Sequence, residues 1–182
     1  MKRDYAMKTL SILLLLVGIA FGGAYGQTNV RLNIVLNHVQ NLTIHPDQNE
    51  VTLTYNDLQD YKRGVEVVKN AHLTVFSTGA YEVKVKLANE EFLKLGGQPT
   101  DRLHMPNIKV KASPVVGDQQ VSLTTGELSA GGSKIISSDR PAFDAIYNVT
   151  YQGPGGEELI RYAEKNKTII FTNDILYSIE TR

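Results

Sequence analysis

Residues 60–87 read DYKRGVEVVKNAHLTVFSTGAYEVKVKL, and the last seven of them, YEVKVKL, alternate between apolar and charged side chains. In a strand, successive side chains point to opposite faces of the sheet, so this pattern predicts one apolar and one charged face. The apolar face consists of Tyr81, Val83, Val85 and Leu87, and the charged face of Glu82, Lys84 and Lys86. Four buried side chains at about 1.5–3 kcal/mol each fix the register, because a one-residue slip would bury the charges. The charged row is expected to face solvent; the alternatives are a binding face or a lysine-guarded edge.

The same period-two pattern recurs along the chain after residue 27. Strands are predicted at residues 29–36, 50–55, 72–77, 81–87, 107–112, 120–125, 142–151, 167–171 and 175–181. Thr78-Gly79 and Thr172-Asn173-Asp174 are turn signals between them. About eight or nine short strands with polar or glycine-rich connections predict an all-β fold, a single Ig-like antiparallel β-sandwich or a small barrel.

The predicted strands also assign faces. Residues 29–36 place Val30, Leu32, Ile34 and Leu36 on one face, and residues 142–151 do the same with Phe143, Ala145, Tyr147, Val149 and Tyr151. Residues 114–118 are expected to connect two strands. Helical periodicity is confined to residues 89–95 and 157–166, which are expected to form no more than short helical turns.

The N-terminus has the pattern of an export signal. Lys2, Arg3 and Lys8 precede an apolar run at residues 10–21, which is shorter than the about 20 residues that span a bilayer. Small residues at Ala24 and Gly26 match a signal-peptidase site, which predicts a signal peptide at residues 1–26 and one domain at residues 27–182. An uncleaved membrane anchor is the alternative. We expect a secreted protein, in the periplasm, at the cell surface or released, with no stable membrane span after leader removal.

The chain contains no cysteine and has a formal net charge of zero. Lipid attachment through a lipobox cysteine, disulfides, thiolate metal sites and cysteine nucleophiles are therefore excluded. The fold must depend on apolar burial, for which the chain is long enough. The balanced charge gives no electrostatic reason to expect nucleic acid or an anionic membrane surface as a partner.

Residues able to carry chemistry are few. The histidines at 38, 45, 72 and 104 lack the spacing of metal ligands, and no nucleophile elbow or phosphate loop occurs. The glycine-rich residues 153–156 are expected to be a plain loop. Oxygen-bearing side chains gather near Asp47, where a weak Ca²⁺ site competes with a polar turn, the favoured interpretation. No catalytic, cofactor-binding or metal residue is assigned, no cofactor is expected, and the protein is not predicted to be an enzyme.

Two parts of the chain carry a family resemblance. Gly64 followed by the run Val65-Glu66-Val67, the Thr-Gly turn and YEVKVKL, together with AFDAIYNVTYQG and the closing pair TIIFTNDILYSIETR, resemble secreted bacterial Ig-like β-sandwich proteins. The related groups are fimbrial subunits and WxL-type surface domains. The resemblance implies a structural or adhesive role at a surface. Tryptophan is absent, and Tyr81-Glu82-Val83 stands where a Trp-x-Leu motif is expected, so cell-wall attachment of the WxL kind lacks its motif.

The leading hypothesis is an exported, non-enzymatic structural or interaction protein that acts through strand and sheet-face contacts in an assembly. Its partners would be other surface or periplasmic proteins, or further copies joined through edge strands, and residues 29–36 and 175–181 are where edge pairing is expected. A carbohydrate- or ligand-binding module is the second hypothesis; it predicts exposed aromatic side chains near residues 95–106 or 126–134, which contain none. A small outer-membrane β-barrel is the third.

Overall fold

The computed structural model describes residues 28–104, 107–116 and 120–182. The predicted signal peptide lies outside these residues, as do residues 117 and 118 of the predicted connection at 114–118. The chain divides into two units, Met1–Leu36 and Asn37–Arg182, which we describe separately. Residues 28–36, the described part of the first unit, form neither helix nor strand, so the prediction of a strand at residues 29–36 is wrong.

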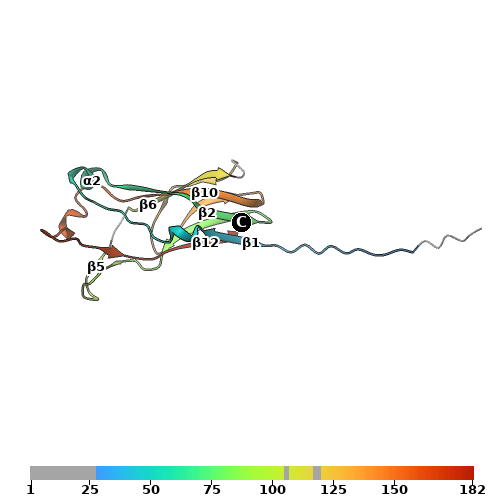
Figure 1. Ribbon diagram of the computed structural model, residues 1–182, viewed down its shortest axis with the longest axis horizontal. Helices are drawn as coiled ribbons and strands as arrows, with labels where there is room; N and C mark the ends of the chain where they lie inside the picture. The colour runs from blue at the N-terminus through green and yellow to red at the C-terminus, as the bar shows by residue number, and fades with distance from the viewer. Residues whose placement is uncertain (1–27, 105–106, 117–119) are drawn as a thin grey trace, which may run out of the picture. The chain divides into compact units, whose positions relative to one another are not determined.

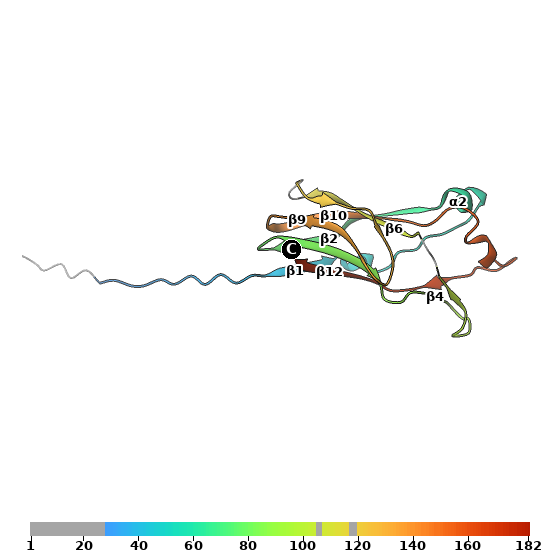
Figure 2. The same cartoon turned by 180° about the vertical axis from the view of Figure 1, so that it is seen from behind.

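The second unit is all-β, as predicted, and its described residues form twelve strands in three antiparallel sheets. In spatial order, the five-stranded sheet contains β1 (Gln40–Ile44), β2 (Glu66–Ser77), β10 (Ala142–Gln152), β6 (Lys109–Val116) and β8 (Gly126–Glu127). The four-stranded sheet contains β12 (Ile175–Thr181), β3 (Tyr81–Leu87), β9 (Ser133–Ser138) and β7 (Ser122–Leu123). A small sheet contains β11 (Phe171–Thr172), β4 (Phe92–Lys94) and β5 (Arg102–Leu103). In Figures 1 and 2, α2, β4 and β5 lie at the opposite end of this unit from the C-terminus.

Helix is confined to short segments in the described chain. They are α2 (Leu58–Arg63) and the 3₁₀ turns η1 (Pro46–Gln48) and η2 (Ile160–Tyr162). A capping box starts α2, since the side chain of Asp57 accepts from the Asp60 backbone N–H while that of Asp60 reaches back to the Asp57 N–H. Gly64 ends the helix at φ 82°, and its N–H donates to the Asp60 carbonyl. No described helix is long and apolar enough to cross a membrane.

One apolar core unites the two larger sheets. Its buried residues include Leu73 and Val75 of β2, Val83 and Val85 of β3, and Val110 of β6. The register predicted for YEVKVKL is confirmed, because its four apolar side chains are buried and its charged ones are not. The strand predicted at residues 175–181 is confirmed with the same bounds.

The face predicted for residues 142–151 is confirmed except at its first residue. Ala145 and Tyr147 are buried as expected, but Phe143 is 82 % exposed and Ala142 is buried instead. The cause is a bulge: the pairing with β2 shifts between Ala142 and Ala145, and Asp144 adopts a φ of 51°. The extra residue reverses the alternation and directs Phe143 outward.

Other predictions are corrected by strand pairing. Residues 50–55 alternate in burial as predicted but join no described strand, and residues 92–94 of the expected helical turn form β4. Only Phe171 of the strand predicted at residues 167–171 is in a strand, and Pro114–Val116 extend β6 rather than connecting it. Five strands lie outside the predicted ranges. β4, β5 and β8 have only two or three residues, too few to show a period, and β1 and β9 have five and six.

Candidate functional site

The segment before β1 exposes an apolar face. Val30 is 93 %, Leu32 82 %, Ile34 76 % and Leu36 88 % exposed. Figure 1 draws the described part of this segment in blue, without helix or strand. Burying four such side chains contributes about 6–12 kcal/mol of hydrophobic free energy. The segment would therefore be strongly stabilised by any surface that covers this face. Residues 29–36 therefore have the pattern of a strand without a strand partner among the described residues.

In the second unit, β12 is the edge strand of the four-stranded sheet. This strand pairs with β3 along its whole length, and its other edge pairs with no described strand. Its inward side chains Ile175, Tyr177 and Ile179 pack on the core but stay partly exposed. The same holds for Leu42 of β1 and for Val51 and Leu53. β1 and β12 lie side by side, and we call the half-buried apolar residues that they contribute, Leu42, Ile175, Tyr177 and Ile179, the open seam.

The opposite side of the core is closed. Residues 122–127 cross from one sheet to the other: Leu123 pairs with Ile136 of β9, and Gly126 pairs with Val110 of β6. A Cβ at Gly126 would lie 2.7 Å from the Ser133 Cβ, so only glycine fits this crossing. Ile135 and Ile136 are consequently buried completely. Val121, next to this crossing, and Phe92 are also only partly buried, so incomplete burial is not confined to the β1–β12 side.

The outer face of the four-stranded sheet carries paired charges. The Lys84 Nζ lies 2.6 Å from a Glu180 carboxylate oxygen, and the Lys134 Nζ lies 2.8 Å from one of Glu82. The hydrogen bond from Lys134 lowers the pKa of Glu82, and that to Glu180 raises the pKa of Lys84. Glu82 and Lys84 of the charged row are therefore each paired with an opposite charge on a neighbouring strand.

A partly buried network of hydrogen bonds runs from η1 to β12. The Gln48 Nε2 donates to the Asn70 carbonyl at 2.8 Å, which leaves the Gln48 Oε1 to accept from the His72 Nδ1–H at 3.1 Å. The His72 Nε2 then accepts from the Tyr151 hydroxyl at 3.0 Å, and the Tyr151 oxygen accepts from the Tyr177 hydroxyl at 2.5 Å. This network joins η1, β2, β10 and β12.

Burial sets the protonation states in this network. His72 is 2 % exposed, and its burial lowers its pKa to about 4. Lys69 and His45 contribute in the same direction, since their positive charges oppose a second one. Burial raises the pKa of Tyr151 to about 12 and also raises that of Tyr177. All three side chains are neutral near pH 7. This hydrogen-bond network therefore connects the elements structurally and contains no charged acid–base pair.

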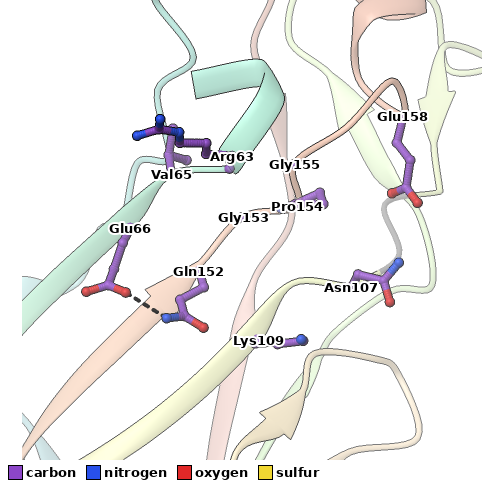
Figure 3. Close-up of a pocket in the computed structure, with 11 residues that line it drawn as sticks. Arg63, Val65, Glu66, Asn107, Lys109, Gln152, Gly153, Pro154, Gly155 and Glu158 are labelled. Atoms are coloured by element: carbon purple, nitrogen blue, oxygen red, sulfur yellow. Dashed lines mark hydrogen bonds between the residues drawn. The ribbon is translucent and has the colours of Figure 1, made fainter. Parts of the chain in front are cut away.

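A polar depression of about 400 Å³ lies where α2, β6 and the loop after β10 meet (Figure 3). Gln152 donates to Glu66 at 2.6 Å across its floor, while Lys109 and Glu158 line other sides. The described lining residues include no aromatic side chain and carry both signs of charge. These features favour no single class of ligand.

The glycine-rich loop beside this depression is structural, as predicted. The Gly153 N–H donates to the Val65 carbonyl at 2.8 Å, and the Gly156 N–H donates to the Tyr61 carbonyl at 2.7 Å. These two amides are therefore engaged by protein carbonyls. A Cβ at Gly64 would lie 2.3 Å from the Gly153 carbonyl oxygen, which explains the glycine there.

A second depression, of about 300 Å³, includes part of the loop at residues 95–106. Thr100, Asp101 and Arg102 line it together with Tyr162 and Phe171, whose rings meet edge to face at 5.9 Å between centroids. The ligand-binding hypothesis predicted aromatic residues near the loop in the sequence. These two come from much later in the chain, so only the fold brings them to the loop.

The structure also places the residues considered for metal binding. Asp47 lies in η1, where its backbone N–H donates to the His45 Nδ1 at 3.4 Å. Among the described residues, no group of three histidine or acidic side chains is arranged to hold a metal ion. η1 is a short 3₁₀ turn with an acidic residue, Asp47, in its only turn.

Comparison with known proteins yields no relative from which a role could be transferred. No family model matches the chain, and no curated protein matches its sequence.

Proposed function

We propose that this chain is an exported, non-enzymatic structural or interaction protein of the cell surface or periplasm. Its second unit would act as an Ig-like β-sandwich, and the chain would join an assembly through strand pairing with other proteins or further copies. The single observation that carries this proposal is the exposed apolar face of residues 29–36. The export signal predicted at residues 1–26 supports the location.

Strand addition fits the physical properties of this segment. A single strand in water pairs none of its backbone groups, and it gains stability only when it joins a sheet. An added strand supplies main-chain hydrogen bonds for affinity, while its alternate side chains provide specificity. Residues 29–36 carry the apolar alternate positions, whereas Arg31 and Asn33 occupy the other face. The segment is therefore suited to lie on a sheet edge beside a partly open core.

The test is the oligomeric state of residues 27–182, measured by size-exclusion chromatography with light scattering over a hundredfold range of concentration. We expect concentration-dependent oligomers without detergent. Ile34→Asp should shift the midpoint of assembly to at least tenfold higher concentration, because a carboxylate would enter the apolar face. Asn33→Asp adds the same charge on the polar face and should leave assembly nearly unchanged.

A monomer at every concentration would rule out self-assembly. It would leave only assembly with a different protein, for which pull-down from the native envelope with wild type and Ile34→Asp as paired baits is the test. Equal capture by the two baits would overturn the role of residues 29–36.

A carbohydrate-binding role is the second candidate, favoured by Tyr162 beside the depression at residues 100–102. The Arg161 guanidinium carbon lies 4.9 Å from the Tyr162 ring centroid, so the ring is flanked by a cation. Binding to a glycan array that is lost in Tyr162→Ala and kept in Tyr162→Phe would establish this function. Absence of binding by the wild type would dismiss it.

A further inference from the structure

We propose that the depression beside residues 100–102 binds a sugar that carries a carboxylate, namely a uronic acid unit of an acidic polysaccharide. This inference rests on carbohydrate binding, the second candidate function, and deepens it by naming the class of sugar. It does not depend on self-assembly. Three observations support it: an aromatic wall, an arginine without an acidic partner, and carboxylates that hydrogen bonds hold in place.

The wall of this depression contains two aromatic rings from different elements. Tyr162 ends η2 and Phe171 begins β11, and their rings meet edge to face with 5.9 Å between centroids. Both side chains are partly exposed, and the pairing of β11 with β4 places Phe171 opposite Lys94. A sugar ring has apolar faces and a polar edge, so it fits a wall of aromatic surface beside hydrogen-bonding groups.

Arg161 is the cation of this site that lacks an acidic partner. Its guanidinium carbon lies 4.9 Å from the centroid of the Tyr162 ring, and its side chain forms no ion pair or hydrogen bond with another described residue. The ring holds the guanidinium by a cation–π contact, and the N–H donors stay available. A guanidinium binds a carboxylate through two parallel hydrogen bonds, so Arg161 is suited to recognise one.

The other cations that line the depression already have acidic partners. The Lys94 Nζ lies 2.6 Å from a Glu164 carboxylate oxygen. The Arg102 Nη1 lies 3.5 Å from a Glu91 carboxylate oxygen, and the Arg102 Nε–H donates to the Pro99 carbonyl at 3.0 Å. Only one cation of the described lining is therefore left for a ligand, which favours a sugar with a single negative charge.

Two carboxylates of the lining are held by hydrogen bonds. Glu164 also accepts from the Lys167 Nζ at 2.8 Å, and the hydrogen bonds from Lys167 and Lys94 lower its pKa to about 2. Asp101 accepts from the Gln98 backbone N–H at 2.9 Å. Each carboxylate keeps further acceptor sites, to which the hydroxyl groups of a sugar can donate. The same two negative charges repel a densely sulfated polymer, so a sugar with one carboxylate and several hydroxyls fits the site better.

Ligands that differ only in the carboxyl group test the inference. Residues 27–182 are titrated calorimetrically at pH 7 with oligomers of galacturonate, glucuronate and mannuronate. Each oligomer is also offered after reduction of its carboxyl groups to alcohols. We expect at least one uronate oligomer to bind, and its reduced form to bind about tenfold more weakly or worse, because a charge-assisted hydrogen bond is lost.

Variants of Arg161 test the residue. Arg161→Gln should weaken binding of the uronate oligomer about tenfold and leave the affinity for the reduced oligomer nearly unchanged, because only the carboxylate contact is removed. Arg161→Lys keeps the charge without the planar fork and should lie between Arg161→Gln and the wild type. The matched control is Lys165→Gln, which removes an exposed positive charge of the same segment outside the lining and should bind as the wild type.

Both positions are exposed, so all variants should melt at the temperature of the wild type. An equal loss of affinity in Lys165→Gln would show that general charge attraction is responsible and would overturn the inference. Unchanged uronate binding by Arg161→Gln would overturn it too.

The remaining outcomes distinguish this inference from carbohydrate binding in general. If acidic and reduced oligomers bind equally and Tyr162→Ala abolishes both, carbohydrate binding stands and the choice of an acidic sugar is wrong. If dextran sulfate binds more tightly than every uronate oligomer, the site takes a sulfate and the inference is overturned. If no uronate oligomer binds, the inference fails, and the glycan array decides whether carbohydrate binding fails with it. Assembly by strand pairing is measured separately, and none of these results bears on it.

Discussion

His72 shows how much a single buried residue can tie together. It lies on β2 and contacts η1 through Gln48, β10 through Tyr151 and, ring to ring, β12 through Tyr177. When the side chain is neutral, both of its ring nitrogens form hydrogen bonds. No carboxylate contributes to its pKa, so a proton added to this ring would be a buried charge without a counter-ion.

His72 should therefore make stability depend on pH. Its pKa is lowered from 6.5 to about 4, so between these values the unfolded chain binds the proton more readily than the folded one. The stabilising contribution is complete above about pH 6.5 and is lost as the pH falls towards 4. At 1.36 kcal/mol per pKa unit, the full loss is on the order of 3 kcal/mol. Urea denaturation at pH 7.0 and pH 4.5 measures most of this loss.

The matched control is His72→Gln, which keeps an amide donor and acceptor but does not titrate. Its free energy of unfolding should change much less over the same pH interval than that of the wild type. The lowered pKa values of Glu82 and Glu164 act in both proteins alike, since the substitution changes neither carboxylate nor its lysine partners. An equal pH dependence in the two proteins would contradict the assignment to His72.

The second prediction for a single residue concerns the stability lost when Gly64 is replaced by alanine. Its φ of 82° disfavours any side chain, and a Cβ would lie 2.3 Å from the Gly153 carbonyl oxygen. Gly96 has a φ of 70°, but a Cβ added there would meet nothing within 4 Å, so it serves as the control. Gly96→Ala should cost about 1–2 kcal/mol from backbone strain alone. Gly64→Ala should cost clearly more in denaturant unfolding, and equal losses would show that the contact with Gly153 is unimportant.

At the scale of elements, the period-two pattern located strands well where at least one neighbouring strand pairs with them. β3 and β12 begin and end where the sequence predicts, because a slip would bury their charged or polar alternate residues. The pattern describes amphipathicity and does not identify a partner. Residues 29–36 and 50–55 have the alternation, yet neither joins a strand ladder in the described structure. Pairing depends on the rest of the fold.

The misses at this scale have local causes. α2 has six residues, too few for a helical period, although Asp57, Asp60 and Gly64 carry its capping signals in the sequence. The sequence does not predict β9, because its serines interrupt the apolar alternation. In the structure Ser137 and Ser138 are nevertheless buried. The bulge at Asp144 reversed one face of β10, and nothing in the alternation signals it. The open seam could not be foreseen, because it depends on which strands become neighbours.

At the scale of the whole molecule, the absence of cysteine leaves apolar burial as the main source of stability. The core is closed on one side and half-buried along the open seam. An added strand would complete the burial there, so assembly and folding stability should be linked. A partner that binds only the folded state raises the free energy of unfolding by mass action.

The melting temperature of residues 27–182 should therefore rise with chain concentration. A chain concentration about 100-fold above the dissociation constant adds about 2.7 kcal/mol, which corresponds to roughly 5–10 °C for a domain of this size. Asn33→Asp should show the same rise, whereas the rise for Ile34→Asp should be clearly smaller, because its apolar face is broken and its assembly is at least tenfold weaker. Differential scanning calorimetry over a hundredfold concentration range measures all three. If the melting temperature of the wild type did not depend on concentration, or if that of Ile34→Asp rose equally, assembly would not be linked to burial of the open seam.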